Sequence, residues 1–191
     1  MVKKSDVTKR RILDAASQEF ARYGIAGARV DRIAADASVN KNLLYVYFGN
    51  KIGLFEVVYE QAIGELLEAV PFDADDLPGY AGALFDFYQQ RPHLLRLARW
   101  FALEGAVELS AAPGLESTIE KATALAAAQA AGKVDAGMSS AAMLALILNI
   151  AATWSDGSPE GTAGPGGDDV QATRRRAIML VVSRLTTPQS A

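Results

Sequence analysis

The sequence contains no cysteine and only one histidine among its 191 residues. The absence of cysteine excludes disulfides, thiol nucleophiles and sulfur-ligated metal sites, and it fits a reducing compartment without proving one. No run of about 18 apolar residues is free of charges and helix breakers, and the opening MVKKSDVTKRR lacks the apolar stretch of a signal peptide. We therefore expect a cytoplasmic chain with no membrane partner.

Residues that could carry out catalysis are also scarce. We find no combination that suggests a Ser-His-Asp triad and no phosphate loop before a helix. The stretch GTAGPGGDD is rich in glycine, but it follows no strand and lacks the lysine of a phosphate loop, and the acidic residues 73–76 are more typical of a linker than of a cation site. We expect no catalytic residue, no metal site and no cofactor.

Charge is distributed unevenly around a net value of −3. Residues 1–51 hold ten Lys and Arg against five Asp and Glu, whereas residues 52–191 hold nine against seventeen. A basic segment joined to an acidic body suggests a polyanionic partner for the small part, although a chance distribution of surface charge remains an alternative.

Segments rich in Ala and Leu, separated by Gly, Pro and Asp, predict helix almost throughout, and no stretch alternates apolar and polar residues between hairpin turns. We therefore predict an all-α fold. The expected helices span 5–23, 30–37, 41–48, 51–70, 79–90, 92–109, 116–133, 140–154 and 170–186. The stretch 155–169, rich in Gly, Pro and Asp, is expected to be a flexible loop.

Two short predicted helices near the N-terminus, 30–37 and 41–48, are joined by a three-residue turn and preceded by a bracing helix. Leu44 and Phe48 lie on one face of the second short helix and Tyr45 on the other, because successive residues rotate by about 100°. This arrangement in a basic segment is typical of a helix-turn-helix unit, whose second helix enters the DNA major groove.

The residues that carry this pattern also resemble a known family. ILDAASQEFARYG, IAADASVN, LYVYF and NKIGLF occur in order and at the family spacing between Ile12 and Val58. They resemble the N-terminal domain of the tetracycline-repressor (TetR) family of bacterial regulators. The resemblance implies a DNA-binding domain at 1–50 with its motif at 29–48, a connecting helix at 51–70, and a helical ligand-binding and dimerisation domain at 71–191.

The family's DNA contacts can be transferred position by position. The resemblance implies that Arg29, Lys41, Tyr45 and Lys51 contact phosphates while Asn42 reads a base edge. Phosphate contacts supply salt-sensitive affinity, and base contacts select sequence. Tyr45 could instead belong to the core, and the two lysines could be ordinary solvated side chains. The complete expected set is Arg29, Lys41, Asn42, Tyr45, Val46, Tyr47 and Lys51, with Tyr47 at the margin.

This chain departs from the family pattern at three places. Ala28 and Arg29 stand where a capping Ser or Thr is common, so a hydroxyl is missing that could bond a phosphate. Ser38 stands where the turn favours glycine, and Ile52 replaces a usual acidic residue. None of these changes removes the motif.

The body is expected to sense a ligand and to form a homodimer. The resemblance implies that the last two helices pair with those of a second copy, and their apolar faces fit that role. A small-molecule site is suggested by an aromatic-rich set on two adjacent segments, although such residues are more often core. The set is Phe85, Tyr88, His93, Leu97, Trp100, Phe101 and Glu104.

Taken together, these features favour a ligand-responsive transcriptional regulator, most simply a repressor that a small molecule of unknown identity releases from a palindromic operator. Two alternatives stay open from the residues alone. The chain could be a helical interaction protein, or it could be a regulator with no small-molecule inducer.

Overall fold

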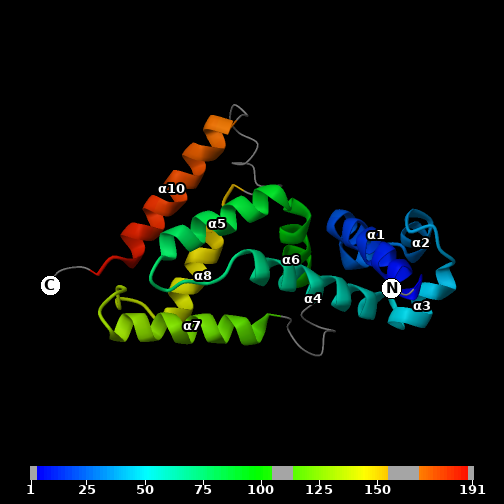
Figure 1. Cartoon of the computed structure of the whole chain (residues 1–191), viewed down its shortest axis with the longest axis horizontal. Coiled ribbons are helices and arrows are strands. Elements are labelled where there is room, and N and C mark those ends of the chain that lie inside the picture. The colour runs from blue at the N-terminus through cyan, green and yellow to red at the C-terminus, as the bar shows by residue number, and fades with distance from the viewer. Residues whose placement is uncertain (1–3, 105–113, 155–167, 189–191) are drawn as a thin grey trace. The chain divides into compact units, whose positions relative to one another are not determined.

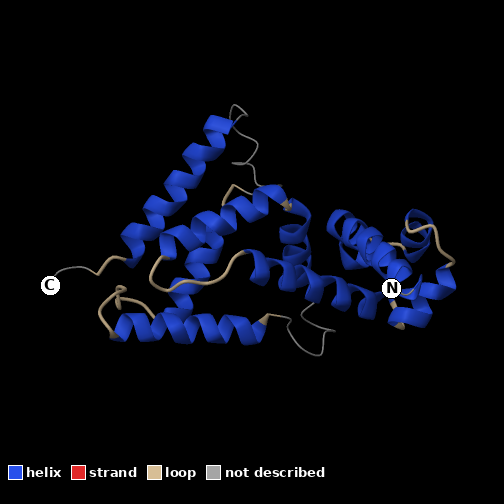
Figure 2. Ribbon diagram, viewed as in Figure 1, coloured by secondary structure: helices blue, strands red, loops and turns tan. Residues whose placement is uncertain are grey.

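The computed structural model describes residues 4–104, 114–154 and 168–188, in which every regular element is a helix (Figures 1 and 2). The all-α prediction is therefore confirmed. None of the helices in these ranges combines the length and apolar content needed to cross a bilayer. The helices are α1 Lys4–Gly27, α2 Val30–Asp36, α3 Lys41–Phe48, α4 Lys51–Ala69, α5 Leu77–Gln90, α6 Pro92–Glu104, α7 Leu115–Ala130, α8 Ser140–Ala151 and α10 Asp168–Thr186.

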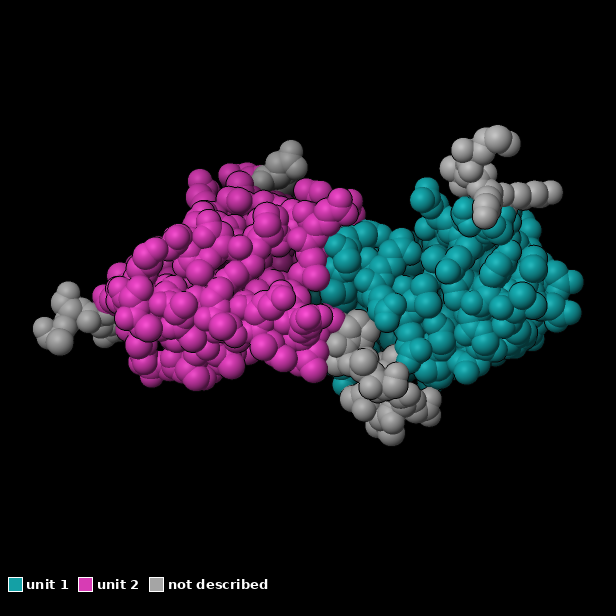
Figure 3. Space-filling model, turned by 60° about the horizontal axis from the view of Figure 1, so that its bottom comes forward, with its two compact units in different colours: residues 1–65, 93–113 teal, residues 66–92, 114–191 magenta. Residues whose placement is uncertain are grey.

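The chain divides into two compact units, which Figure 3 distinguishes by colour. The first unit contains residues 1–65 and 93–113, and the second contains residues 66–92 and 114–191. Helix α4 therefore begins in the first unit and ends in the second, while α6 belongs to the first. The domain boundaries expected at residues 50 and 70 remain a prediction.

The core of the first unit forms where the apolar stripe of α1 meets α4. Ile12, Ala16 and Phe20 recur at helical spacing and have no exposed surface. The ring of Phe20 meets Phe55 edge-on at 5.2 Å, and Phe55 stacks on Tyr59 at 5.9 Å. These contacts fix α1 against the helix that connects the two units.

Gly24 interrupts α1 with φ 70° and ψ −179°, a conformation that L-residues rarely adopt. The sequence predicted a helix stop here, and the chain does leave helical geometry at this residue. A Cβ at this position would lie 2.8 Å from the Trp100 ring and 2.9 Å from Glu104 Oε1, both on α6. Glycine is needed here for its conformation and for its lack of volume.

The second unit is assembled around α5, which packs against α8 and α10, while α7 packs against α8. Helix α5 ends at Gln90 and α6 begins at Pro92, as predicted from the restriction that proline places on the preceding residue. The predicted loop at 155–169 lies outside the described residues except for its last two positions, which begin α10. Residues 105–109 of the predicted sixth helix also lie outside them.

We predict that Gly24→Ala lowers the free energy of unfolding by about 2 kcal/mol or more, because the new methyl group meets Trp100 in an unfavourable backbone conformation. Gly64→Ala is the matched control: Gly64 lies in the exposed middle of α4, and an added Cβ would have no neighbour within 4 Å. It should raise stability by up to about 1 kcal/mol. Chemical denaturation followed by circular dichroism measures both, and equal effects would contradict our account of Gly24.

Candidate nucleic-acid interface

Helix α3 presents two opposite faces, as its sequence predicts. Leu44 and Phe48 are buried at 2% and 8% exposure, whereas Tyr45 and Val46 are exposed at 43% and 76%. Tyr47 is half-buried and meets the Phe48 ring at 6.1 Å. Asn42, Tyr45 and Val46, all expected to face DNA, therefore lie on the accessible side of α3, and Tyr47 lies at its margin.

Two asparagines fix the starts of the helices on either side of the α3–α4 turn. The side-chain oxygen of Asn40 accepts a hydrogen bond from the Asn42 backbone N–H at 2.8 Å, and Asn50 accepts one from the Gly53 N–H at 2.8 Å. Both arrangements satisfy amides that the first turn of a helix leaves without a partner. Asn50 therefore caps the start of α4.

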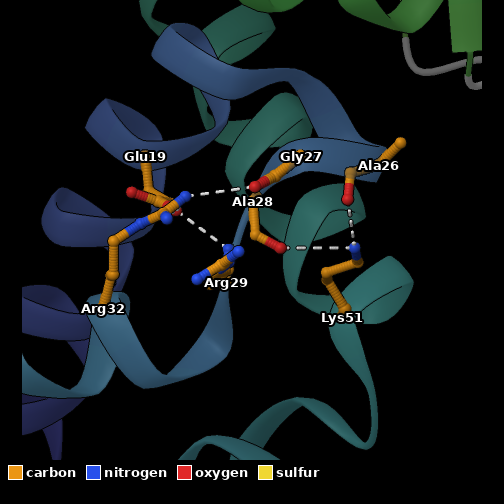
Figure 4. A network of polar contacts seen from close by, with 7 residues as sticks. All are labelled: Glu19, Ala26, Gly27, Ala28, Arg29, Arg32 and Lys51. Atoms are coloured by element: carbon orange, nitrogen blue, oxygen red, sulfur yellow. Dashed lines mark hydrogen bonds and ion pairs between the residues drawn. The ribbon is translucent and has the colours of Figure 1, made fainter.

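A buried carboxylate holds the entry of α2 (Figure 4). Glu19 is only 5% exposed, and its Oε1 accepts hydrogen bonds at 2.8 Å from the Arg29 backbone N–H and from Arg32 Nε. The hydrogen bond between the side chains of Arg32 and Glu19 is the largest cause of the raised pKa of Arg32. Arg29 makes no side-chain cap for α2, so the carboxylate of α1 takes the place of the hydroxyl common at this position.

Lys51 is tied to the backbone at the end of α1 and in the link to α2 (Figure 4). Its ammonium donates hydrogen bonds to the carbonyl oxygens of Ala26 at 3.2 Å and Ala28 at 3.3 Å. The side chain that the family resemblance assigns to a phosphate therefore also fixes the position of α2 relative to α4. An ammonium has three donors, so a phosphate can add to these bonds.

Lys41 is paired with a carboxylate. Its Nζ lies 2.8 Å from Asp31 Oδ1, and this hydrogen bond is the first cause of the raised pKa of Lys41. Asp31 is 75% exposed, so water screens the pair and it contributes little to stability. The pair instead joins the first turn of α3 to α2 and places a negative charge beside an expected phosphate contact.

Ser38, in the turn between α2 and α3, has φ 51°, in the left-handed region. This explains the family preference for glycine there, because a Cβ makes that conformation costly. The turn still closes, with the Ser38 N–H donating to Ala35 O and the Val39 N–H to Ala34 O, both at 2.9 Å. The departure leaves the geometry of the motif intact and adds local strain.

The seven residues predicted to bind a ligand fall into both compact units. Phe85 and Tyr88 belong to the second unit and are buried, whereas the other five belong to the first. His93 helps to line a cavity of about 250 Å³ between α1, α4 and α6, which does not include the other six. Their shared role in ligand binding stays a prediction.

Trp100, Phe101 and Glu104 have structural partners within the first unit. The Trp100 indole N–H donates to Ala21 O at 3.2 Å, and the Ala26 N–H donates to Glu104 Oε2 at 2.9 Å. Phe101 stacks on Tyr59 at 4.5 Å. Together with the fully buried Leu97, they pack α6 against α1 and α4.

Sequence reasoning overlooked several of these polar partners. Glu19 lies seven residues after Ile12 on the buried stripe of α1, and a carboxylate at such a position signals a paired, buried charge. Asp31 and Glu104 carry no comparable signal, since their partners are distant backbone or side-chain atoms. The described residues include no cluster of three His, Cys, Asp or Glu that could hold a metal ion.

Comparison with known proteins matches both parts of the chain to family models. The model for bacterial regulatory proteins of the tetR family matches residues 12–58, and the model for the tetracyclin repressor-like C-terminal domain matches residues 76–184. Together they cover the motif and most of the helical body.

Individual relatives agree with these matches. The chain is 37% identical to the HTH-type transcriptional repressor SCO4008 of Streptomyces coelicolor, over 94% of this chain and 97% of the relative. A crystal structure of the transcriptional regulator SCO4942 from Streptomyces coelicolor matches with a TM-score of 0.82 and 40% identity, covering 94% and 98% of the two chains. A gamma-butyrolactone receptor shares the fold with a TM-score of 0.69 at 19% identity, covering 97% and 91%.

We predict that Ser38→Gly raises the free energy of unfolding by about 0.5–1 kcal/mol, because glycine adopts the left-handed conformation without steric cost. Ser38→Ala is the matched control, since it removes the hydroxyl but keeps the Cβ and should not stabilise. Urea denaturation monitored by circular dichroism measures both. Equal stabilisation by the two variants would show that the hydroxyl, not the backbone, is the source of strain.

Proposed function

Because the chain belongs to the tetracycline-repressor family of transcriptional regulators, we propose that it is a ligand-responsive repressor that binds a palindromic operator as a homodimer. The observation that carries this proposal is the exposed face of α3, with Tyr45 and Val46 accessible and Lys41 at its first turn. Members of this family regulate transcription rather than catalyse reactions, and we propose the same for this chain, acting on DNA in the cytoplasm.

The proposed contacts divide between affinity and sequence selection. Lys41, Arg29, Tyr45 and Lys51 would bind phosphates, with the N-terminal amides of α4 assisting Lys51. Asn42, exposed in the first turn of α3, would read a base edge through its amide. A recognition surface of this kind supports a sequence-specific regulator over a helical protein that interacts only with other proteins.

The proposed homodimer would use α8 and α10. Both helices expose large apolar side chains, with Leu146 at 43%, Leu180 at 52% and Val181 at 49% exposure. A two-fold axis would place equivalent recognition helices about 34 Å apart, one turn of DNA, and thus require an approximately palindromic operator.

A small molecule is the proposed signal for release. One protein of the same fold is a gamma-butyrolactone receptor, which supports ligand response in the helical body here. A ligand that favours one conformation of the body would shift the population of DNA-competent dimers. A regulator without an inducer remains the alternative that ligand titration tests.

We predict that Lys41→Ala and Tyr45→Ala each weaken operator binding by about ten-fold or more without unfolding the protein, because each removes a contact from both half-sites. For Lys41→Ala, the slope of log affinity against log salt should fall by about two, one phosphate contact from each subunit. Fluorescence anisotropy with a fragment selected from the source genome gives both values.

Two further variants control this experiment. Asp31→Asn removes the carboxylate paired with Lys41 and should tighten operator binding, since a negative charge leaves the interface. Lys133→Ala removes an exposed lysine of the second unit, paired with Asp75, and should leave affinity unchanged. Unaltered binding in the Lys41 and Tyr45 variants would reject the proposed reading face.

We predict that Leu180→Glu converts the dimer to monomer at micromolar concentration, because it buries a charge in an apolar interface. Leu103→Glu is the control: Leu103 is 76% exposed on α6, outside the proposed interface, and should leave the dimer intact. Sedimentation velocity distinguishes the two states. A Leu180→Glu variant that remains dimeric would exclude α10 from the centre of the interface.

A further inference from the structure

A groove lies between the end of α4 and α7 in the second unit. Its volume is about 370 Å³, and Leu67, Val70 and Phe72 provide an apolar wall. This volume lies within the range of small-molecule sites, about 300–1,000 Å³. The groove is formed by residues other than the seven that the sequence suggested.

The opposite wall of this groove contains a half-buried cation. Lys121 belongs to α7, and its ammonium lies 5.8 Å from the centroid of the buried Tyr80 ring, which Phe72 meets edge-on at 5.0 Å. Burial is the main cause of the lowered pKa of Lys121, opposed by the charge of Glu120. The surroundings therefore disfavour its charged form.

Among the described residues, Lys121 has no hydrogen bond or ion pair to offset this burial. Lys133 provides the contrast, since its Nζ lies 2.7 Å from Asp75 Oδ1. A half-buried ammonium without a carboxylate partner has lost hydration that only the Tyr80 ring partly replaces. An anion entering the groove would restore the missing interaction.

The neighbouring polar residues restrict which anion fits. Ser117 lines the groove one helical turn before Lys121, so its hydroxyl and the ammonium lie on the same side of α7. Glu120 also lines the groove, and its carboxylate repels an anion in proportion to the charge that the anion carries. One carboxylate attached to an apolar body suits this arrangement better than a phosphate ester or a dicarboxylate.

We propose that this groove binds a small hydrophobic monocarboxylate. The carboxylate accepts hydrogen bonds from Lys121 and Ser117, and the hydrocarbon or aryl body lies on Leu67, Val70 and Phe72. The inference rests on the proposed function, because it names the chemical class of the effector.

A ligand in this groove would touch the helix that also reaches the DNA-binding motif. Leu67 lies near the end of α4, and Lys51, tied to the α1–α2 junction, begins the same helix. Ligand binding that favours one position of the end of α4 would therefore affect the DNA-binding motif, which lies at the start of the same helix.

Three probes of nearly equal shape test the ligand class on the full-length protein: 4-phenylbutyrate, its neutral amide and 4-phenylbutylamine. Isothermal titration calorimetry should show the acid binding about ten-fold or more tightly than the amide, the size expected for a charge-assisted hydrogen bond. The amine should bind weakest of the three. Equal affinity for acid and amide, tighter binding of the amine, or binding of none of them would overturn the proposal.

Matched variants locate the interaction. Lys121→Met keeps an apolar stem over Tyr80 but removes the charge, so it should bring the affinity for the acid down to that for the amide. Lys133→Met should leave the preference for the acid unchanged. An acid preference that persists in Lys121→Met, or disappears in Lys133→Met, would refute the role of Lys121. The comparison of the three probes uses the unmodified protein, so its result does not depend on whether a variant folds.

Operator binding distinguishes this inference from the function on which it rests. The acid should weaken binding of the unmodified protein to its operator, and Lys121→Met should bind the operator normally but no longer respond to the acid. Normal operator binding with no preference for the acid would reject the groove and leave the regulator intact. Failure to bind any genomic fragment, with the acid preference present, would reject the regulator and leave the groove.

Discussion

The DNA-binding motif depends on the hydrogen bonds that the Glu19 carboxylate accepts. This carboxylate lies within the core of the first unit, and it accepts hydrogen bonds from the backbone of Arg29 and the side chain of Arg32. A buried carboxylate is costly unless such donors compensate it, so the entry of α2 has little freedom to move away. Arg32 in turn donates to Gly27 O at 3.1 Å, which ties the same short segment a second time.

Side chains from four helices, α1, α2, α4 and α6, hold the backbone of residues 26–29. Lys51 of α4 bonds the carbonyls of Ala26 and Ala28, and Glu104 of α6 accepts from the Ala26 N–H. The polar backbone groups at the junction of α1 and α2 thereby acquire side-chain partners. The cost is that Lys51 serves both the fold and, in our proposal, the phosphate backbone, so removing it would confuse stability with DNA affinity. Lys41, whose partner Asp31 is largely exposed, is the clearer residue for dissecting recognition.

The sequence was sufficient for what depends on periodicity and local capping. The spacing of Leu44 and Phe48 determines which face of α3 is buried, and Asn50 caps a helix through atoms three residues away. Contacts between distant segments could not be predicted in this way. The aromatic residues of α6 could belong to a ligand site or, as is more common, to the core, and only the fold shows that the Trp100 indole donates a hydrogen bond to Ala21 O. Lys121 is a candidate ligand contact only because the fold places α7 beside the end of α4.

The free energies involved show why one groove residue would be enough for the regulation that we propose. Allosteric coupling between two sites is typically about 1–3 kcal/mol, which is close to the contribution of a single hydrogen bond to a charged group. In our proposal, Lys121 therefore need not be one of many ligand contacts, provided that its bond forms in only one conformation of the body. The apolar wall of Leu67, Val70 and Phe72 supplies affinity that can be equal in both conformations. Regulation requires a difference between them, and in our proposal the charged contact of Lys121 on α7 is the interaction most sensitive to a small displacement, because hydrogen bonds depend steeply on distance and angle.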